Sequence, residues 1–131
     1  MAGNYLITEA NTITEAIYPQ TGVSVSSSTL VDMRDFRRFL TVAQHGTATT
    51  ASAFNIRIYE STASTWDGAV AVLLTQTTVS VVTASTALET LEISSDDMTD
   101  GKRYLGVFLT KVDTASSLAS STIRSNDRYL G

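Results

Sequence analysis

The sequence has 131 residues, with 13 acidic and nine basic side chains and a formal net charge of −4, and a chain of this length can bury a core without a disulfide or a metal. It contains no cysteine, which excludes disulfides, cysteine-ligated zinc, iron–sulfur clusters and thiol nucleophiles. The acidic balance opposes binding to nucleic acid, and neither a signal peptide nor an apolar run of the roughly 18 residues that a membrane span requires is present.

Hydroxyl side chains dominate the composition, with 16 serines and 21 threonines beside a single proline. Threonine, valine and isoleucine favour strands because their branched side chains fit a pleated surface. Disordered or glycosylated stalks are also rich in serine and threonine, but they are rich in proline and poor in large apolar residues. Since 43% of the residues here are hydrophobic, the composition indicates a folded β domain.

The first 22 residues differ from the rest, because apolar side chains are scattered among polar ones before Pro19 and Gly22. Two interpretations are open: residues 1–22 form an extended arm, or Tyr5–Ile7 and Ile13–Tyr18 are the first edge strands of a sheet. In either case the apolar side chains need a surface to be buried against. They are Tyr5, Leu6, Ile7, Ile13, Ile17 and Tyr18.

From residue 23 onward, short runs alternate between apolar and polar positions and are separated by small and polar residues, which is typical of strands. In the clearest run, Phe54–Glu60, alternate residues starting at Phe54 share an apolar face, and the opposite face, with Arg57, is expected to be wet. Arg103–Thr110 is the most apolar run, and we expect it at the centre of a sheet. The other predicted strands cover residues 23–26, 30–33, 37–43, 70–74, 79–82, 88–93 and 118–124.

About eight strands at spacings of roughly eight to twelve residues, without a clear amphipathic helix, are typical of sandwiches and jelly rolls. We therefore predict an all-β fold: a single antiparallel β-sandwich, as a jelly roll of about eight strands, over residues 23–131, preceded by the arm or edge strands of residues 1–22. The short C-terminal tail carries Arg128, Tyr129 and Leu130, and the last two would be costly to leave in water.

Patterns for catalysis and metal binding are weak. His45 is the single histidine and precedes Gly46; without a G-x-S-x-G motif we interpret it as a turn or surface residue rather than as a general base. Asp96, Asp97 and Asp100 could bind a hard cation, but their spacing is not that of an EF-hand loop, so we expect a polar loop or a single helical turn. We predict no enzyme activity, no cofactor and no metal.

Two further features have a functional and a structural interpretation. Arg34, Arg37 and Arg38 lie next to Asp32 and Asp35 and could bind a carboxylate of a partner, but we prefer to interpret them as alternating surface charge. Trp66 stands in a turn of small and polar residues, so its ring either folds back onto the core, which we favour, or forms part of a contact patch.

The order of several features is informative. Val31-Asp32-Met33 precedes a strand, Ile56–Glu60 forms one, Ser64–Gly68 is a turn, Asp100–Tyr104 enters a strand, and Asp127-Arg128-Tyr129 closes the chain. From residue 30 to residue 129 this order resembles small jelly-roll proteins of tailed bacteriophages, some of which serve as capsid decoration, or cement, proteins.

The resemblance implies a structural virion protein on the outer surface of the capsid, which bridges neighbouring subunits of the major capsid protein, stabilises the shell and carries no catalytic residue. Copies of the chain would associate as dimers or trimers about symmetry axes, and neither nucleic acid nor a membrane is expected as a partner. Extended terminal segments suit such bridging, since they cover a long span of partner surface per residue. The candidate partner-binding residues are Tyr5, Leu6, Ile7, Ile13, Ile17, Tyr18, Trp66, Arg128, Tyr129 and Leu130.

Three alternatives remain open. The chain could be another structural protein of a phage head or tail. It could be a carbohydrate-binding β-sandwich adhesin, in which Trp66, Tyr59 and Tyr104 would form a stacking platform. It could also be a small hydrolase with His45 as the base.

Overall fold

The computed structural model describes residues 11–20, 25–47, 52–67, 71–81, 86–111 and 118–125. The described residues form strands joined by loops, with one turn of 3-10 helix, and every strand pair is antiparallel. None of these segments is a helix long and apolar enough to cross a membrane. The elements are β1 (Asn11–Gln20), β2 (Val25–Ser27), β3 (Val31–Asp32), β4 (Arg38–His45), β5 (Ser52–Ser61), β6 (Val72–Val81), β7 (Ala87–Ser94), η1 (Ser95–Asp97), β8 (Tyr104–Lys111) and β9 (Leu118–Ser125).

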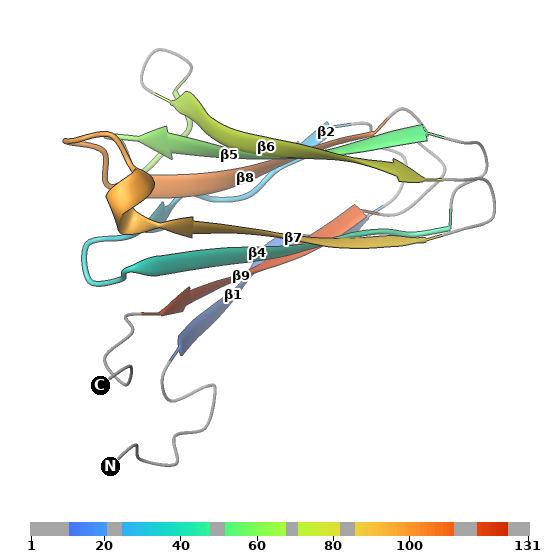
Figure 1. The fold of residues 1–131 in the computed structure, drawn as a ribbon, viewed down its shortest axis with the longest axis horizontal. Helices are drawn as coiled ribbons and strands as arrows, with labels where there is room; N and C mark the ends of the chain where they lie inside the picture. Colours follow the sequence, from blue (N-terminus) through green and yellow to red (C-terminus); the bar gives the residue numbers. More distant parts are fainter. Residues whose placement is uncertain are drawn as a thin grey trace.

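The strands form two facing sheets (Figure 1). Sheet A has the order β1-β9-β4-β7, and sheet B has the order β2-β8-β5-β6, with β3 also paired to β8. Because β2 and β3 both pair with β8, they count as one interrupted strand, and the arrangement is an eight-stranded jelly roll. The prediction of an all-β antiparallel sandwich with about eight strands is confirmed.

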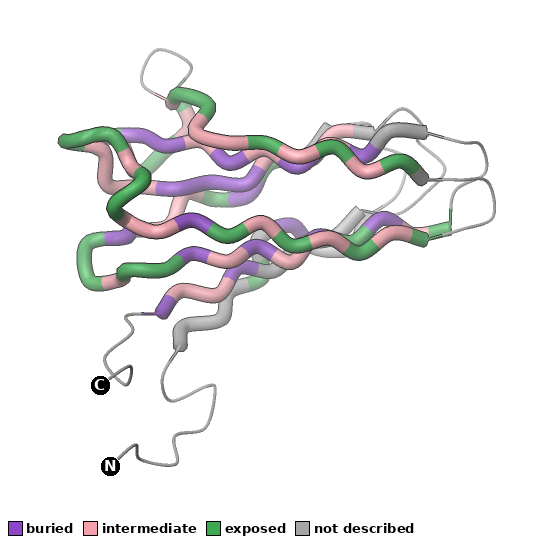
Figure 2. The backbone as a smooth tube through the Cα atoms, in the orientation of Figure 1, coloured by how far each residue is buried: buried purple, intermediate pink, exposed green. Residues whose placement is uncertain are grey.

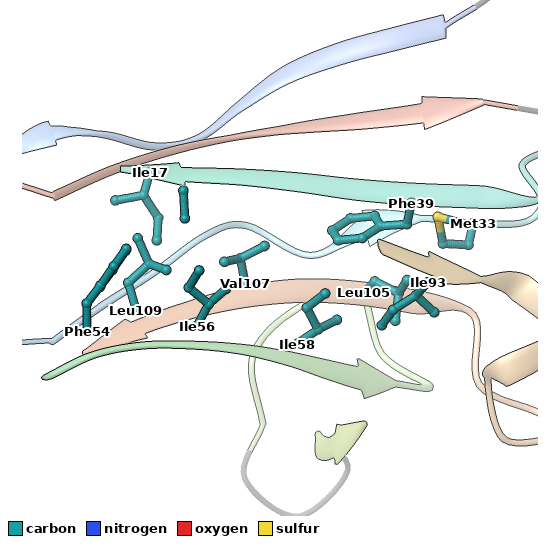
Figure 3. Close-up of a cluster of buried hydrophobic side chains, with 11 residues drawn as sticks. Ile17, Met33, Phe39, Phe54, Ile56, Ile58, Ile93, Leu105, Val107 and Leu109 are labelled. Carbon is teal, nitrogen blue, oxygen red and sulfur yellow. The ribbon is translucent and has the colours of Figure 1, made fainter. Parts of the chain in front are cut away.

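The core lies between the sheets, and the alternation of side chains explains it. From β5, Phe54, Ile56 and Ile58 point inward and are fully buried, and Leu105 and Val107 of β8 lie beside them (Figure 3). Along β5, buried residues alternate with half-buried ones from Phe54 to Glu60 (Figure 2), as expected for residues that point to opposite faces of a sheet. In β8 the buried Gly106 interrupts this alternation, because Leu30 and Trp66 lie against it on the outer face. Burying each large apolar side chain contributes about 1.5–3 kcal/mol.

The most apolar predicted run became β8, which lies between β2 and β5 in sheet B, so its expected central place is confirmed. The predicted strands 70–74 and 79–82 are instead one continuous strand, β6. The polar residues between them, Thr75–Thr78, suggested a break in the sequence, but an edge strand tolerates them because one side of it faces water.

Ile17 lies in the core because of a β-bulge in β1. Glu15 pairs with Ser121 and Ile17 pairs with Ser120, so the register shifts by one residue between them. A bulge of this kind changes the face to which the following residue points, and Ile17 is 2% exposed whereas Glu15 is exposed. Ile17 therefore packs in the domain's own core rather than on a surface open to a partner.

The segment of residues 1–22 thus contributes an edge strand, β1, from Asn11 to Gln20. Tyr5, Leu6 and Ile7 lie outside the described residues. The backbone of Ile13 and Tyr18 belongs to β1, but their side chains lie outside the described part of the structure.

Candidate functional site

The two ends of the described chain meet at one corner of sheet A. Asn11, the first residue of β1, is the register partner of Ser125, the last residue of β9. The start of β1 and the end of β9 lie side by side in Figure 1. We call the Asn11–Ser125 pair the terminal corner. Residues 1–10 and 126–131 continue from it, and they hold the candidate anchors Tyr5, Leu6, Ile7, Arg128, Tyr129 and Leu130, all outside the described residues.

The loop between β3 and β4 is fastened to the terminal corner. The amide of Arg37 donates to the carbonyl oxygen of Ser125 at 2.9 Å, and Arg38 is the register partner of Ser125 in β4. Arg34 and Arg37 are exposed beside it. The predicted basic cluster therefore lies next to the point where both terminal segments begin.

Within that cluster, Arg38 forms an ion pair with Glu92 of β7, with 3.3 Å between Nη1 and Oε1. Both side chains are about half exposed, so the pair contributes at most about 1 kcal/mol. This ion pair with Glu92 explains Arg38 with no need for a contact to another protein, which agrees with the preferred interpretation of alternating surface charge.

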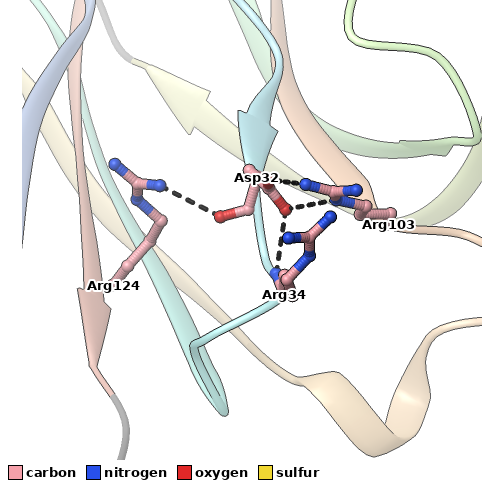
Figure 4. A network of polar contacts seen from close by, with 4 residues as sticks. All are labelled: Asp32, Arg34, Arg103 and Arg124. Carbon is pink, nitrogen blue, oxygen red and sulfur yellow. Dashed lines mark hydrogen bonds and ion pairs between the residues drawn. The ribbon is translucent and has the colours of Figure 1, made fainter.

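Behind the corner, Asp32 of β3 is held by an arginine that the sequence analysis did not connect to it (Figure 4). Arg103 Nε donates to Asp32 Oδ1 at 2.8 Å, and Arg103 Nη2 donates to Oδ2. The backbone amide of Arg34 also donates to Oδ1, at 2.9 Å. The hydrogen bonds from Arg103 hold the pKa of the Asp32 carboxyl well below its usual range, and the same carboxylate raises the pKa of Arg103.

Arg124 joins this network from the other sheet. It lies in β9 of sheet A, and its Nη1 donates to the backbone carbonyl oxygen of Asp32 in sheet B at 3.0 Å (Figure 4). Its guanidinium lies 4.7 Å from the centre of the Phe36 ring, a cation–π geometry. Burial lowers the pKa of Arg124. The network thus ties the two sheets together directly behind the terminal corner.

A second surface feature is the aromatic cluster, which we define as Tyr59, Trp66 and Phe108 on the outer face of sheet B. Ring centroids are 5.6 Å apart for Tyr59–Trp66, 5.9 Å for Tyr59–Phe108 and 6.4 Å for Trp66–Phe108. Gly106 leaves room for the indole, since a Cβ there would lie 2.6 Å from Trp66 Cζ2. Trp66 therefore folds back onto the domain, but onto the outer face of the sheet and not into the core.

Ser28 fixes the indole in place at the interruption between β2 and β3. The indole Nε1 of Trp66 donates to the carbonyl oxygen of Ser28. Ser28 in turn bonds β8, because its amide donates to the Val107 carbonyl and its hydroxyl accepts from the Val107 amide, both at 2.8 Å. The buried Ser28 hydroxyl takes the place of a strand carbonyl as the acceptor for the Val107 amide, which would otherwise be buried without a hydrogen bond at a cost in free energy.

The ring geometry of the cluster does not suit sugar stacking. The planes of the three rings are inclined to one another by 64–74°, so they form edge-to-face contacts and not a shared platform. Tyr104 lies beside Arg103, whose guanidinium is 5.3 Å from its ring centre. The platform expected for the adhesin alternative is not formed by these residues.

The interpretation of His45 as a turn or surface residue was wrong. His45 is fully buried at the end of β4, and its ring lies 5.4 Å from that of Phe54. Phe39, Thr41 and Ala43 precede it on the same inward face of β4, and the alternation simply continues to the last residue of the strand. A base inaccessible to water and substrate does not suit the hydrolase alternative.

The polar environment of His45 also differs from that of a catalytic base. Its Nδ1 lies 2.7 Å from the carbonyl oxygen of Gly46, which places the ring hydrogen on Nδ1 as the donor. Nε2 has no hydrogen-bond partner among the described residues. The histidine therefore acts as a core side chain.

The acidic segment forms a capped helical turn, η1. The Ser94 hydroxyl accepts from the Asp96 amide at 3.3 Å, and Asp97 Oδ2 accepts from the Ser94 amide at 3.0 Å. Ser94 and Asp97 form a capping box at the start of this turn. Within the described ranges, no group of three or more acidic or histidine side chains could hold a metal ion. The Asp97 carboxylate therefore has a structural role in the turn.

Comparison with known proteins gives likeness of fold alone. No protein-family model matches the chain, and no curated protein matches it in sequence. A chain from the structure of infectious bursal disease virus strain Gx superposes with a TM-score of 0.59 at 11% identity, covering 92% of this chain and 32% of that one. A chain of the VP2 subviral particle of the same virus gives a TM-score of 0.54 at 12% identity, covering 91% and 33%.

Another chain of the same fold comes from a bacterial enzyme. The xylanase 10B of Clostridium thermocellum, with its CBM22-1 and GH10 modules, superposes with a TM-score of 0.53 at 9% identity, covering 90% of this chain and 25% of that one. The present chain spans about a third of the length of the virus-particle chains it matches. The fold it shares with them is the β-sandwich, here with jelly-roll topology.

The contact between Trp66 and Gly106 gives a first prediction. Gly106→Ala should lower the free energy of unfolding by about 1–3 kcal/mol, because its methyl group overlaps Leu30 Cδ2 and Trp66 Cζ2. In a Trp66→Ala background, Gly106→Ala should lower the free energy of unfolding by less, because the indole that overlaps the added methyl group has been removed. Urea unfolding of the single and double variants measures the coupling.

Gly101→Ala is the matched control for that cycle. Gly101 has a φ of +85° and nothing within 4 Å of an added Cβ. Gly101→Ala should therefore lower the free energy of unfolding through backbone strain alone, by the same amount with or without Trp66. A Gly106→Ala cost that does not change in the Trp66→Ala background would contradict the described contact.

The Asp32 network gives a second prediction, on pH. The pKa of Asp32 is lower in the folded protein than the value of about 3.9 in the unfolded chain. Its stabilisation is therefore present above the unfolded pKa and is lost as pH falls through the folded pKa. Asp32→Asn should lower the unfolding free energy at pH 7 by about 1 kcal/mol, a value limited by solvent screening, and this difference should shrink towards pH 2.

Asp35→Asn serves as its control, because Asp35 is an exposed carboxylate of the same loop. Urea unfolding between pH 7 and pH 2 should show a wild-type advantage over Asp32→Asn that fades with acid, and a much smaller effect for Asp35→Asn. A difference in unfolding free energy between wild type and Asp32→Asn that stays constant across this range would show that the charge of the Asp32 carboxylate does not stabilise the folded protein.

Proposed function

We propose that this chain is a structural virion protein: a capsid decoration protein that binds the outer surface of a phage head and bridges neighbouring subunits of the major capsid protein. The observation that carries the proposal is the terminal corner, where Asn11 and Ser125 are paired. The jelly-roll fold, shared with chains of virus particles, and the resemblance to small phage jelly-roll proteins support it.

The terminal corner suits a clamp with two arms. Residues 1–10 and 126–131 begin side by side at the edge of sheet A and carry large apolar side chains among polar ones. The core of the described residues is formed by the strands of the sandwich, and we propose that the apolar side chains of the two terminal segments bind the partner. Two segments that start from one point can follow two neighbouring subunits, and extended segments cover much surface per residue.

Anchoring must outweigh the entropy of ordering the segments. Fixing one backbone residue costs about 1–2 kcal/mol, and burying one large apolar side chain returns about 1.5–3 kcal/mol. Tyr5, Leu6 and Ile7 are consecutive in the N-terminal segment, and Tyr129 and Leu130 are consecutive in the C-terminal one. Concentrated anchors of this kind favour binding by short segments.

The domain behind the corner is suited to bear load. The Arg103–Asp32–Arg124 network joins sheet A to sheet B next to Ser125, so a pull on the terminal segments is transmitted to both sheets. Copies of the chain would also associate with one another about symmetry axes of the shell.

The test is co-sedimentation of the purified chain with empty heads stripped of accessory proteins. Binding should saturate at a fixed ratio to the major capsid protein. The triple variant Tyr5→Ser, Leu6→Ser, Ile7→Ser should bind at least about tenfold more weakly, because it removes apolar contacts that contribute more than the 1.4 kcal/mol equal to one factor of ten. The substitutions leave β1 and its core residue Ile17 intact.

Leu88→Ser is the matched control, because Leu88 is an apolar side chain of sheet A that is 68% exposed and far along β7 from the corner. It should bind like the wild type. Absence of saturable binding to heads, binding to tails in place of heads, or equal weakening by both variants would each overturn the proposal.

A further inference from the structure

Over most of its length, one sheet edge lacks the features by which proteins prevent strands of different molecules from pairing. Edges are normally blunted by charged side chains, proline, bulges or short length. At the edges of the two sheets, β1 carries Glu15, Pro19 and two register shifts, β2 has three residues, and β7 carries Glu89 and Glu92. The fourth edge, β6, has one such feature, a bulge at Leu74 near its start, and none from Thr75 to Val81.

Strand β6 is ten residues long, from Val72 to Val81, and contains no charged residue and no proline. It pairs with β5 on one side, and no described strand pairs with its other side (Figure 1). A bulge at Leu74 interrupts its pairing with β5, but from Thr75 to Val81 the register is regular. These seven residues therefore form a regular, uncharged edge, and the backbone groups on its outer side pair with no strand in the described part of the chain.

We propose that β6 pairs antiparallel with β6 of a second copy of this chain about a two-fold axis, which joins the two B sheets into one continuous sheet. The proposal names the surface for the self-association that forms part of the proposed function, and it does not depend on binding to a shell. A strand added to a sheet edge is held by main-chain hydrogen bonds.

A second copy fits this edge better than an unrelated strand because the edge is complementary to itself. Thr78 is the midpoint of the regular segment. With Thr78 facing its own copy, Gln76 faces Ser80 and Thr77 faces Val79, so two polar side chains meet in one row, two side chains of similar volume meet in the next, and no row brings like charges together. A two-fold contact requires such self-complementarity.

Charge also favours this edge for contact between copies. Each chain carries a net charge of −4, so copies repel one another in general. Edges β1 and β7 would bring carboxylates together, whereas β6 would not. The nearest charged side chain of the outer face, Arg57 of β5, is bonded to Gln76, with 3.2 Å between Nε and Oε1.

The test is a charge exchange at Thr78, whose side chain is exposed, followed by sedimentation equilibrium from micromolar to millimolar concentration. The wild type should form dimers. Thr78→Lys and Thr78→Glu should each weaken the dimer by about five- to tenfold, because like charges then face each other across the axis. An equimolar mixture of the two variants should recover the association.

Two controls separate the charge from its side effects. Thr78→Val loses the hydrogen bond from Thr78 Oγ1 to Asn55 Oδ1, at 2.6 Å, without adding a charge, and should still dimerise. Thr90→Lys places the same charge on an exposed site of β7, and should dimerise like the wild type. Hydrogen exchange of the wild type gives a readout independent of the variants, since amides of residues 75–81 should lose protection on dilution.

A monomer at all concentrations, or a dimer that neither Thr78→Lys nor Thr78→Glu weakens, would overturn the pairing. Protection of residues 75–81 only in the presence of heads would overturn it too, by assigning the edge to a strand of the capsid. A dimer that responds to the charge exchange but does not bind heads would leave the pairing standing and defeat the proposed function, so the two failures are distinguishable.

Discussion

Burial of alternate side chains between two sheets determines where every other feature of the domain can lie. Phe54, Ile56 and Ile58 fill the interior from sheet B, and Phe39 closes it from sheet A. Because this alternation fixes the register of each strand, it also fixes which residues remain on the outside. The aromatic cluster on the outer face of sheet B is a consequence of that register, whereas the edge position of β6 follows from the order of the strands.

Much of the fold could be predicted from local pattern, because alternation over a few residues is a local property. Features that depend on distant partners could not be. Arg103 and Arg124 meet Asp32 across sequence separations of 71 and 92 residues, and nothing near either arginine points to that carboxylate. His45 appeared to end a strand at the surface, but the inward alternation of β4 includes its last residue. The bulge that turns Ile17 inward likewise has no signature in the sequence.

The two proposed contacts lie on opposite edges of the sandwich and so do not compete. In sheet A, β1 is at one edge and β7 at the other, while in sheet B the edges are β2 and β6. Contacts across the sandwich place β1 over β2 and β6 over β7. The terminal corner therefore belongs to the edge far from β6, and one molecule could hold a shell at one edge and a second copy at the other. Such an arrangement lets paired domains bridge surfaces that a single domain would not span.

Electron cryomicroscopy of stripped heads, reconstructed with and without the added chain, tests the central claim most directly. Binding through the terminal corner predicts added density of the size of this sandwich on the outer surface of the head, with the β1–β9 edge of sheet A directed towards the shell. Unchanged heads, added density on the inner surface, or a domain docked with the terminal corner directed away from the shell would contradict it.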